Sequence, residues 1–275
     1  KKENNKMSTQ LNQLVVGIKG AGEMASAIAW RLYQANISRI FMMEIPHPIA
    51  VRRAVSFCEA VHDGNSTVEG VEAQRVDDSR KIKQIWDNKQ IAVLMDPGWI
   101  TIAKVQPQVV IDAILAKKNT GTAMTEAPLV IGLGPGFIAA KDVHMVVETN
   151  RGHNLGRIIA AGGAERDTGI PGDIGGYTVQ RVLRAPADGI FQTTRAIADQ
   201  VKPGDIIGTV EAKKVSAEIG GILRGLIRSD TRVPSGLKLG DIDSRGDAAY
   251  CYTISDKGRA IAGSVLEAIL RKYNI

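Results

Sequence analysis

The sequence contains few aromatic residues, few cysteines and few histidines, and each shortage argues against a class of function. Aromatic residues make up 4% of the chain and are not interleaved with basic residues, so we expect no nucleic-acid partner. Cys58 and Cys251 lie far apart and form no C-x-x-C pair, which suits a reducing cytoplasm and argues against a thiolate metal site. The four histidines form no H-E-x-x-H or H-x-H pattern, so we expect no metal.

Long apolar runs are also missing. No segment is long enough to span a membrane, and no leader-like hydrophobic segment follows the basic start, so we expect a cytoplasmic protein without a membrane partner. The formal charge of +6 arises from 35 basic and 29 acidic residues and is compatible with a small anionic ligand or with a solvated basic surface. The length of 275 residues allows two domains after a flexible tail at 1–12.

A glycine-rich motif follows the first apolar run. Leu14–Ile18 predicts a strand, and Gly20 and Gly22 lie between it and an amphipathic helix. A second predicted strand ends at Glu44, 19 residues after Ala25. This order is typical of a dinucleotide-binding unit, in which the glycines let a pyrophosphate approach backbone N–H groups and the acid binds a ribose diol. Such loops also occur as simple tight turns, so both interpretations remain open at this point.

Glu23 is a difficulty for the nucleotide interpretation, because its carboxylate would lie close to a pyrophosphate of like charge. Lys19 could offset that charge. Arg52 and Arg53 fall off the apolar stripe of a helix predicted over 49–62 and could meet a ligand phosphate, although a solvated helix face is the commoner use.

Further strands are predicted at 68–76, 91–95, 109–114, 129–131 and 143–147, with helices between several of them. This alternation predicts that residues 13–150 form a Rossmann-like, mostly parallel sheet domain with helices on both faces. The carboxyl ends of parallel strands form a ligand crevice. Turns at these ends contain the remaining candidate site residues, which are Gly134, Gly136, Glu148, Arg151 and His153.

The second half of the chain contains an internal repeat with a period of 32 residues, after a connecting segment at 151–183. In the first copy Ala185, Gly189, Ile190, Val201, Gly204, Gly208 and Val210 match Ala217, Gly221, Ile222, Val233, Gly236, Gly240 and Ile242 in the second. Each copy is rich in turn residues and β-formers. Two such units predict a small β-barrel with pseudo-two-fold symmetry over 184–247. A strand and a helix capped by Ser255 are expected over 248–275.

The pattern A-P-x-x-G, V-x-x-G-D and G-x-V-E-A-x-K resembles the biotinyl/lipoyl family of half-barrel domains. In that family a lysine at the hairpin between the two halves carries the prosthetic group, and Lys214 occupies this place. The methionines that flank the modified lysine are replaced by Lys213 and Val215. We therefore expect a barrel without biotin on Lys214.

Several motifs together resemble those of the YqeB-type proteins of the selenium-dependent molybdenum hydroxylase system, from about Leu14 onward. They are the segments at 20–25, 52–57, 132–137, 148–153, 168–172 and 221–227. The resemblance implies an accessory role in maturing or inserting a labile selenium-bearing molybdenum cofactor. The implied partners are a molybdenum hydroxylase or its other maturation factors. Together with the glycine loop, this role leads us to expect NAD(P), another nucleotide or a molybdopterin-type cofactor as the ligand.

Two alternatives come from other functional classes. One is an NAD(P)-dependent oxidoreductase, which the glycine loop and Glu44 favour, although no Tyr-x-x-x-Lys pair is present. The other is a carrier protein modified on Lys214. The sequence assigns no catalytic residue, does not decide whether a reaction is catalysed, and leaves homo-oligomer formation open.

Overall fold

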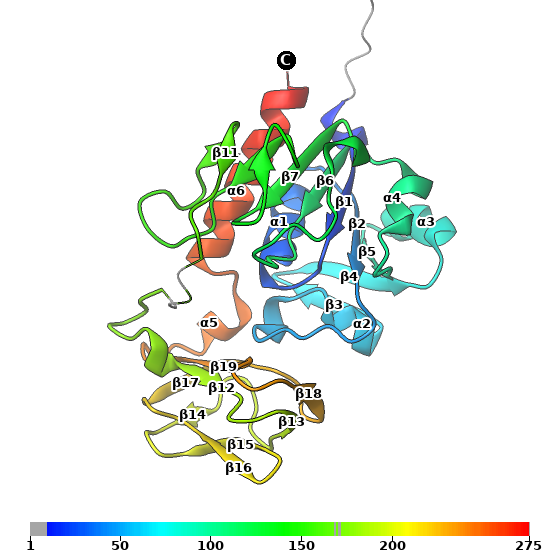
Figure 1. Cartoon of the computed structure of the whole chain (residues 1–275). Coiled ribbons are helices and arrows are strands. Elements are labelled where there is room, and N and C mark those ends of the chain that lie inside the picture. Colours follow the sequence, from blue (N-terminus) through cyan, green and yellow to red (C-terminus); the bar gives the residue numbers. More distant parts are fainter. Residues whose placement is uncertain (1–9, 168, 170–171, 275) are drawn as a thin grey trace, which may run out of the picture.

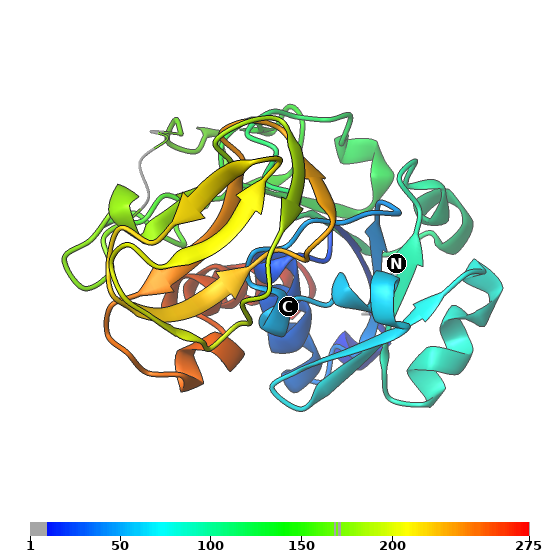
Figure 2. The same ribbon diagram turned by 90° about the horizontal axis from the view of Figure 1, so that it is seen from below.

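The computed structural model describes residues 10–167, 169 and 172–274. Figure 1 shows two parts, a larger one built on a nine-stranded sheet and a smaller half-barrel beneath it. The view from below shows the half-barrel under one side of the large sheet, with the cyan β3–β4 hairpin left uncovered (Figure 2). Among the described residues, no helix combines the length and the apolar character needed to cross a membrane.

The large sheet is mixed and has the strand order β10-β9-β7-β6-β1-β2-β5-β4-β3. Its strands are β1 (Val15–Lys19), β2 (Arg39–Glu44), β3 (Asn65–Val68), β4 (Val71–Val76), β5 (Ile91–Met95), β6 (Val109–Asp112), β7 (Leu129–Leu133), β9 (Met145–Val147) and β10 (Ile158–Ile159). The seven inner strands are parallel, and the edge strands β3 and β10 are antiparallel to their neighbours. Most inner strands are continuous apolar runs, as expected for a sheet buried on both faces.

Helices cover both faces of the central strands. The helices α1 (Glu23–Gln34) and α6 (Asp256–Tyr273) pack together on one face, and α3 (Ile82–Asp87) and α4 (Ile100–Val105) lie over the other. The short helix α2 (Glu59–Asp63) precedes the β3–β4 hairpin. The α6 helix begins at Ser255, whose hydroxyl accepts the Gly258 N–H at 3.2 Å, so the predicted N-cap is confirmed.

The predicted pairing of a Rossmann-like domain with a biotinyl/lipoyl-like barrel is wrong. The large sheet is mixed, because the antiparallel strands β3 and β10 flank its seven parallel strands and β4 adds a strand beyond β5. No α-helix connects β6 to β7 or β7 to β9; these described connections contain only a 3-10 turn (Met124–Glu126) and β8 (Ile138–Ala139). Instead, helix α6, which follows the half-barrel in the sequence, covers one face of the sheet together with α1.

The half-barrel consists of two open four-stranded sheets with the orders β12-β19-β17-β14 and β16-β15-β13-β18, so it is not a closed barrel. Its strands are β12 (Val182–Arg184), β13 (Gly189–Gln192), β14 (Gln200–Val201), β15 (Ile206–Val210), β16 (Lys213–Ser216), β17 (Gly221–Leu226), β18 (Thr231–Val233) and β19 (Lys238–Asp243). Matching positions of the two repeats make matching hydrogen bonds in the half-barrel. Gly204 N–H donates to Ala217 O and Gly236 N–H donates to Ala185 O, both at 2.8 Å.

The segments that flank the half-barrel differ in part from the sequence expectation. Within the connecting segment, β10 joins the large sheet and β11 (Gly162–Gly163) pairs with β8, so the larger part extends beyond residue 150. A 3-10 turn (Val179–Arg181) leads into β12. After the half-barrel, a short helix α5 (Ala249–Tyr252) stands where a strand was expected.

Gly208 in β15 allows close packing that a side chain would prevent. A Cβ at this position would lie 2.5 Å from Gln192 O and 2.7 Å from the Phe191 ring. We expect Gly208→Ala to lower the free energy of unfolding by about 1–3 kcal/mol through overpacking. Chemical denaturation would measure the change. In the matched control Gly263→Ala, an added Cβ meets nothing within 4 Å in helix α6, and we expect no loss of stability. Equal stability of both variants would contradict this account.

Candidate functional site

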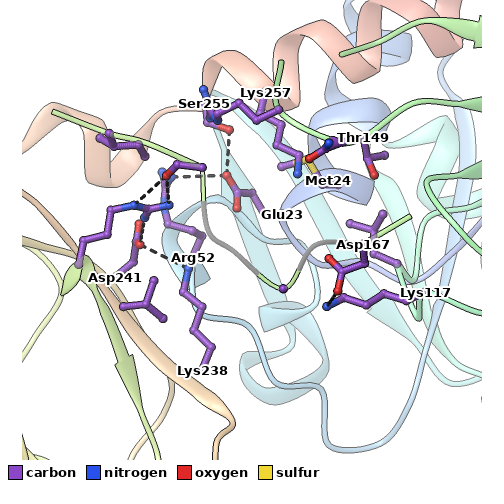
Figure 3. Close-up of a pocket in the computed structure, with 18 of the residues that line it drawn as sticks. Glu23, Met24, Arg52, Lys117, Thr149, Asp167, Lys238, Asp241, Ser255 and Lys257 are labelled. Atoms are coloured by element: carbon purple, nitrogen blue, oxygen red, sulfur yellow. Dashed lines mark hydrogen bonds and ion pairs between the residues drawn. The ribbon is translucent and has the colours of Figure 1, made fainter. Parts of the chain in front are cut away.

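A cavity of about 730 Å³ lies between the carboxyl edge of the large sheet and the half-barrel. We call it the junction pocket. Its basic lining residues are Arg52, Lys117, Arg151, Arg166, Arg181, Arg184, Arg224, Lys238 and Lys257, and its acidic ones are Glu23, Glu165, Asp167 and Asp241. The lining therefore carries more basic than acidic side chains. Figure 3 shows that they come from both parts of the molecule.

The glycine loop reaches this pocket through the N-terminus of α1. Gly20 has a φ of +86°, and its N–H donates to Met43 O at 2.8 Å, which turns the chain sharply after β1. Gly22 is the N-cap of α1, and no side chain caps this end of the helix. A Cβ on Gly22 would meet nothing within 4 Å. The loop therefore leaves the first N–H groups of α1 without a side-chain acceptor, next to the pocket residue Met24.

Glu44 holds the loop from the neighbouring strand. Its Oε1 accepts the Ala21 N–H and its Oε2 accepts the Ile45 N–H, both at 2.8 Å. Burial raises the pKa of this carboxyl, against the opposing effect of the two N–H donors. Both oxygens are thus already hydrogen-bonded to backbone, and Glu44 does not line the junction pocket. Its visible role is to fix the turn between β1 and α1.

Arg52 lines the junction pocket, whereas its neighbour Arg53 does not. Arg52 is only 4% exposed, lines the pocket, and donates to Tyr250 O at 2.8 Å and to Thr253 O at 3.0 Å. Burial lowers the pKa of Arg52. Arg53 lies outside the lining and donates to Leu226 O at 2.7 Å. Both guanidinium groups therefore bridge the larger part of the molecule to the C-terminal region or the half-barrel.

The three polar residues expected after β9 do not form one cluster. Glu148 is buried and accepts the N–H groups of Thr149, Asn150 and Glu165, each at 2.7 Å, so it shapes the turn. Arg151 lines the pocket and forms a two-bond ion pair with Asp256.

The Arg151 hydrogen bond lowers the pKa of Asp256 to about 2. His153 is exposed and lies outside the lining. Of the three residues, only Arg151 reaches the pocket.

Gly134 and Gly136 allow close packing of the loop after β7. Their φ values are +72° and +109°. A Cβ on Gly134 would lie 2.5 Å from Thr149 Oγ1, and one on Gly136 would lie 2.5 Å from the Lys118 backbone. Because neither glycine lines the pocket, they contribute indirectly, by letting Pro135 and Thr149 form its wall.

The half-barrel side of the pocket is an ionic cluster around Asp241, which the sequence analysis missed. The carboxylate of Asp241 is 1% exposed and pairs with Arg181, Arg224 and Lys238. Burial would raise the pKa of Asp241, but these three cations outweigh that effect and hold it below its ordinary value. The available signal was the position of the charged residues Arg224 and Asp241 within the predicted barrel strands, where side chains alternate into the core.

Lys257 was also missed by the sequence analysis, because a lysine in the first turn of a predicted amphipathic helix usually faces solvent. It is half-buried, and burial lowers its pKa. It forms no hydrogen bond or ion pair with any described residue, and Figure 3 shows its side chain extending toward Met24 and Thr149. Glu23 lies nearby and accepts Ser255 Oγ–H at 3.0 Å.

Metal ligands, a reactive thiol and the barrel lysine Lys214 are not brought together at the junction pocket by the described residues. Among residues 10–167, 169 and 172–274, no group of three or more His, Cys, Asp or Glu side chains could hold a metal ion. Cys58 is buried in the core, and burial raises its pKa well above the ordinary value. Lys214 is exposed within β16 and pairs with Thr209, outside the junction pocket. The arrangement can bind an anion, and it assigns no catalytic residue.

Comparison with solved structures gives only weak likenesses. TcdA (CsdL) is 15% identical with a TM-score of 0.33, over 94% of this chain and 89% of that one. An aspartoacylase family protein from Mesorhizobium loti MAFF303099 is 12% identical with a TM-score of 0.27, over 83% of this chain and 84% of that one. At such TM-scores neither likeness carries an argument about fold or activity.

Comparison of sequences gives a clear relative. No family model matches the chain. The "Uncharacterized protein YqeB" of Escherichia coli strain K12 is 46% identical over 259 residues, which cover 94% of this chain and 48% of that protein. The chain thus spans about half the length of the curated relative that it matches. At this identity over nearly its whole length, the chain belongs to the YqeB family.

Proposed function

We propose that this protein binds a phosphate-bearing cofactor in the junction pocket and supports the maturation of a selenium-dependent molybdenum hydroxylase. The cofactor is a nucleotide such as NAD(P) or a molybdopterin-type compound, which share anionic phosphate groups. The basic lining of the pocket supports the ligand class. The resemblance of the sequence motifs to the YqeB-type accessory proteins supports the maturation role and the hydroxylase, or its other maturation factors, as partners.

One observation carries the binding proposal. The N-terminus of the 12-residue helix α1 has no side-chain cap, and the ammonium of Lys257, which pairs with no described residue, reaches toward the same place, near Met24. Free N–H groups at a helix N-terminus together with the helix dipole favour an anion. Lys257 adds a full positive charge that no described carboxylate pairs with directly. A phosphate group at this position would accept hydrogen bonds from the free N–H groups of α1 and pair with the Lys257 ammonium.

The alternative of an NAD(P)-dependent oxidoreductase receives no specific support. Glu44, the residue expected to bind a ribose diol, has both oxygens hydrogen-bonded to backbone N–H groups. The junction pocket could still bind a nicotinamide cofactor through its phosphates. Binding and delivery of a cofactor need only side chains that hold its phosphates. A redox reaction would also need a group that transfers a proton.

Gly22→Val tests the position of the phosphate. An added side chain meets no protein atom within 4 Å, so the fold should tolerate it, but it would occupy the space in front of the α1 N-terminus. We expect affinity to fall by about tenfold or more for any member of an NAD(P), ATP, CTP and molybdopterin-nucleotide panel that binds the wild type. Isothermal titration calorimetry would measure it, with Gly263→Ala as the control. Unchanged affinity, or a wild type that binds none of the panel, would refute the site.

Lys257→Met tests the role of the lysine through pH. Because burial lowers the pKa of Lys257, its charge is lost at a lower pH than that of an ordinary lysine. A bound phosphate favours the protonated amine, so wild-type affinity should fall as the pH rises through the range in which this amine loses its proton, which in the free protein begins below that of an ordinary lysine.

We expect Lys257→Met to bind about tenfold more weakly at about pH 8 and to lose most of this pH dependence. Lys272→Met, at an exposed position on the same helix, should behave as the wild type. Identical pH profiles for the two variants would contradict a role for Lys257.

The biological role is tested by deleting the gene in its native host. We expect the molybdenum hydroxylase polypeptide to be present but inactive, with its cofactor absent or incomplete, because delivery has failed while translation has not. Immunoblotting, activity assays and metal and selenium analysis of the purified hydroxylase would measure this. Complementation with Gly22→Val should restore less activity than complementation with Gly263→Ala. A fully active hydroxylase in the deletion strain would overturn the maturation role.

A further inference from the structure

The half-barrel wall of the junction pocket carries more positive charge than its own carboxylate can neutralise. Its charged lining residues are four cations, Arg181, Arg184, Arg224 and Lys238, and one acid, Asp241. Both oxygens of Asp241 already accept hydrogen bonds, Oδ1 from Arg181 and Lys238 and Oδ2 from Arg224. This carboxylate therefore has no oxygen left for Arg184, and it neutralises Lys238 only in part.

Arg184 and Lys238 stand opposite each other on neighbouring strands. β12 pairs with β19 in antiparallel register, and Arg184 is the partner of Lys238. The register shifts between Leu183 and Arg184, an irregularity of the kind that re-aims a side chain. Opposed residues on one face have Cβ atoms about 4.5–5.5 Å apart, and like charges in such positions repel each other. Since both side chains line the pocket, an anion bound there would relieve this repulsion.

Both cations have donors that are open to a ligand. Arg184 is exposed, and of its guanidinium nitrogens only Nη1 has a partner among the described residues, Gly236 O at 2.9 Å. The Lys238 side chain is 37% exposed and makes one hydrogen bond with the described residues, to Asp241 Oδ1 at 3.3 Å. An ammonium has three N–H donors, so Lys238 can bind a ligand without leaving Asp241.

Lys238 also lies within electrostatic reach of the position proposed for the phosphate. Burial is the main cause that lowers the pKa of Lys257, and repulsion by Lys238 contributes to it. Burial likewise lowers the pKa of Lys238, and attraction by Asp241 and by Glu23, the first residue of α1, opposes this effect. Figure 3 shows Lys238 extending from the half-barrel and Lys257 from the start of α6, with Glu23 between them. One ligand in the cavity can therefore reach both walls.

We propose that the ligand of the junction pocket carries two separate phosphate groups and that Arg184 and Lys238 bind the second one. This inference rests on the proposed function, because it takes the phosphate at the α1 N-terminus as the first group. A phosphate has several oxygens, so it can accept hydrogen bonds from both cations at once. Such a ligand joins the large sheet to the half-barrel, whereas a compound without the second phosphate contacts only one side of the site.

Two pairs of nucleotides that differ by one phosphate group test the inference. They are NAD⁺ with NADP⁺ and dephospho-coenzyme A with coenzyme A, in which the added phosphate lies on neighbouring ribose hydroxyls. In calorimetric titrations of the whole chain, we expect the added phosphate to tighten binding by about tenfold or more in at least one pair. Arg184→Met and Lys238→Met should each remove most of this gain and change the affinity for the compound without the added phosphate by less than about threefold.

Lys202→Met is the matched control. It removes one positive charge from an exposed position on the half-barrel, outside the junction pocket, and should keep the gain. Thermal unfolding shows whether each variant is folded. Lys238→Met opens the ionic cluster around Asp241, so if it does not fold, Arg184→Met decides the question, because Arg184 is exposed and forms no ion pair with the described residues.

The result that overturns this inference differs from the one that overturns the proposed function. If the added phosphate gives no gain in either pair, or if the gain survives in a folded Arg184→Met or Lys238→Met, the second phosphate position is refuted. Should Gly22→Val still weaken binding in that case, the proposed function stands. Binding of none of the four compounds also refutes the second position, and the other members of the ligand panel then decide the proposed function.

Discussion

The buried guanidinium of Arg52 is the interaction on which the arrangement of the two parts depends. It comes from the larger part and donates to the carbonyl oxygens of Tyr250 and Thr253, on the chain segment that leaves the half-barrel. It also lies 3.4 Å from Glu23 Oε1, at the start of α1. This side chain therefore links the glycine loop, the end of the half-barrel and the start of α6, and Arg53 and the pair of Arg228 with Glu59 join the two parts nearby. The junction pocket exists because these three segments are held together.

The pocket can be strongly basic because most of its cations already have partners within the protein. Asp241 holds three of them on the half-barrel side, and Asp256 holds Arg151 on the other. Desolvation of charges is tolerated only when such pairing is present. Lys257 and the exposed Arg166 differ, since neither has a direct partner among the described residues. The charges that shape the pocket and the charges without internal pairing are thus carried by different side chains.

The sequence predicted local structure well where it depends on short-range patterns, and the site poorly where it depends on distant segments. The apolar run at 91–95 is strand β5, and the Ser255 cap lies where it was predicted. The helix predicted over 49–62 is divided into a 3-10 turn and α2, and Arg52, just before the turn, is tied to the C-terminal region. Asp241 and Lys257 could not be assigned to the pocket, since only the long-range packing of the half-barrel and α6 brings them there.

The packing of α6 on α1 has a consequence for the order in which the protein folds. These helices stand at opposite ends of the described chain and share one apolar core, with the whole half-barrel between them in sequence. Contacts between such distant segments form late and slow the folding of the part that contains them. During synthesis the half-barrel, whose strands all lie within residues 182–243, can be complete while α1 alone covers the face of the large sheet that α6 will share. That face would be the surface most in need of protection by a chaperone until translation ends.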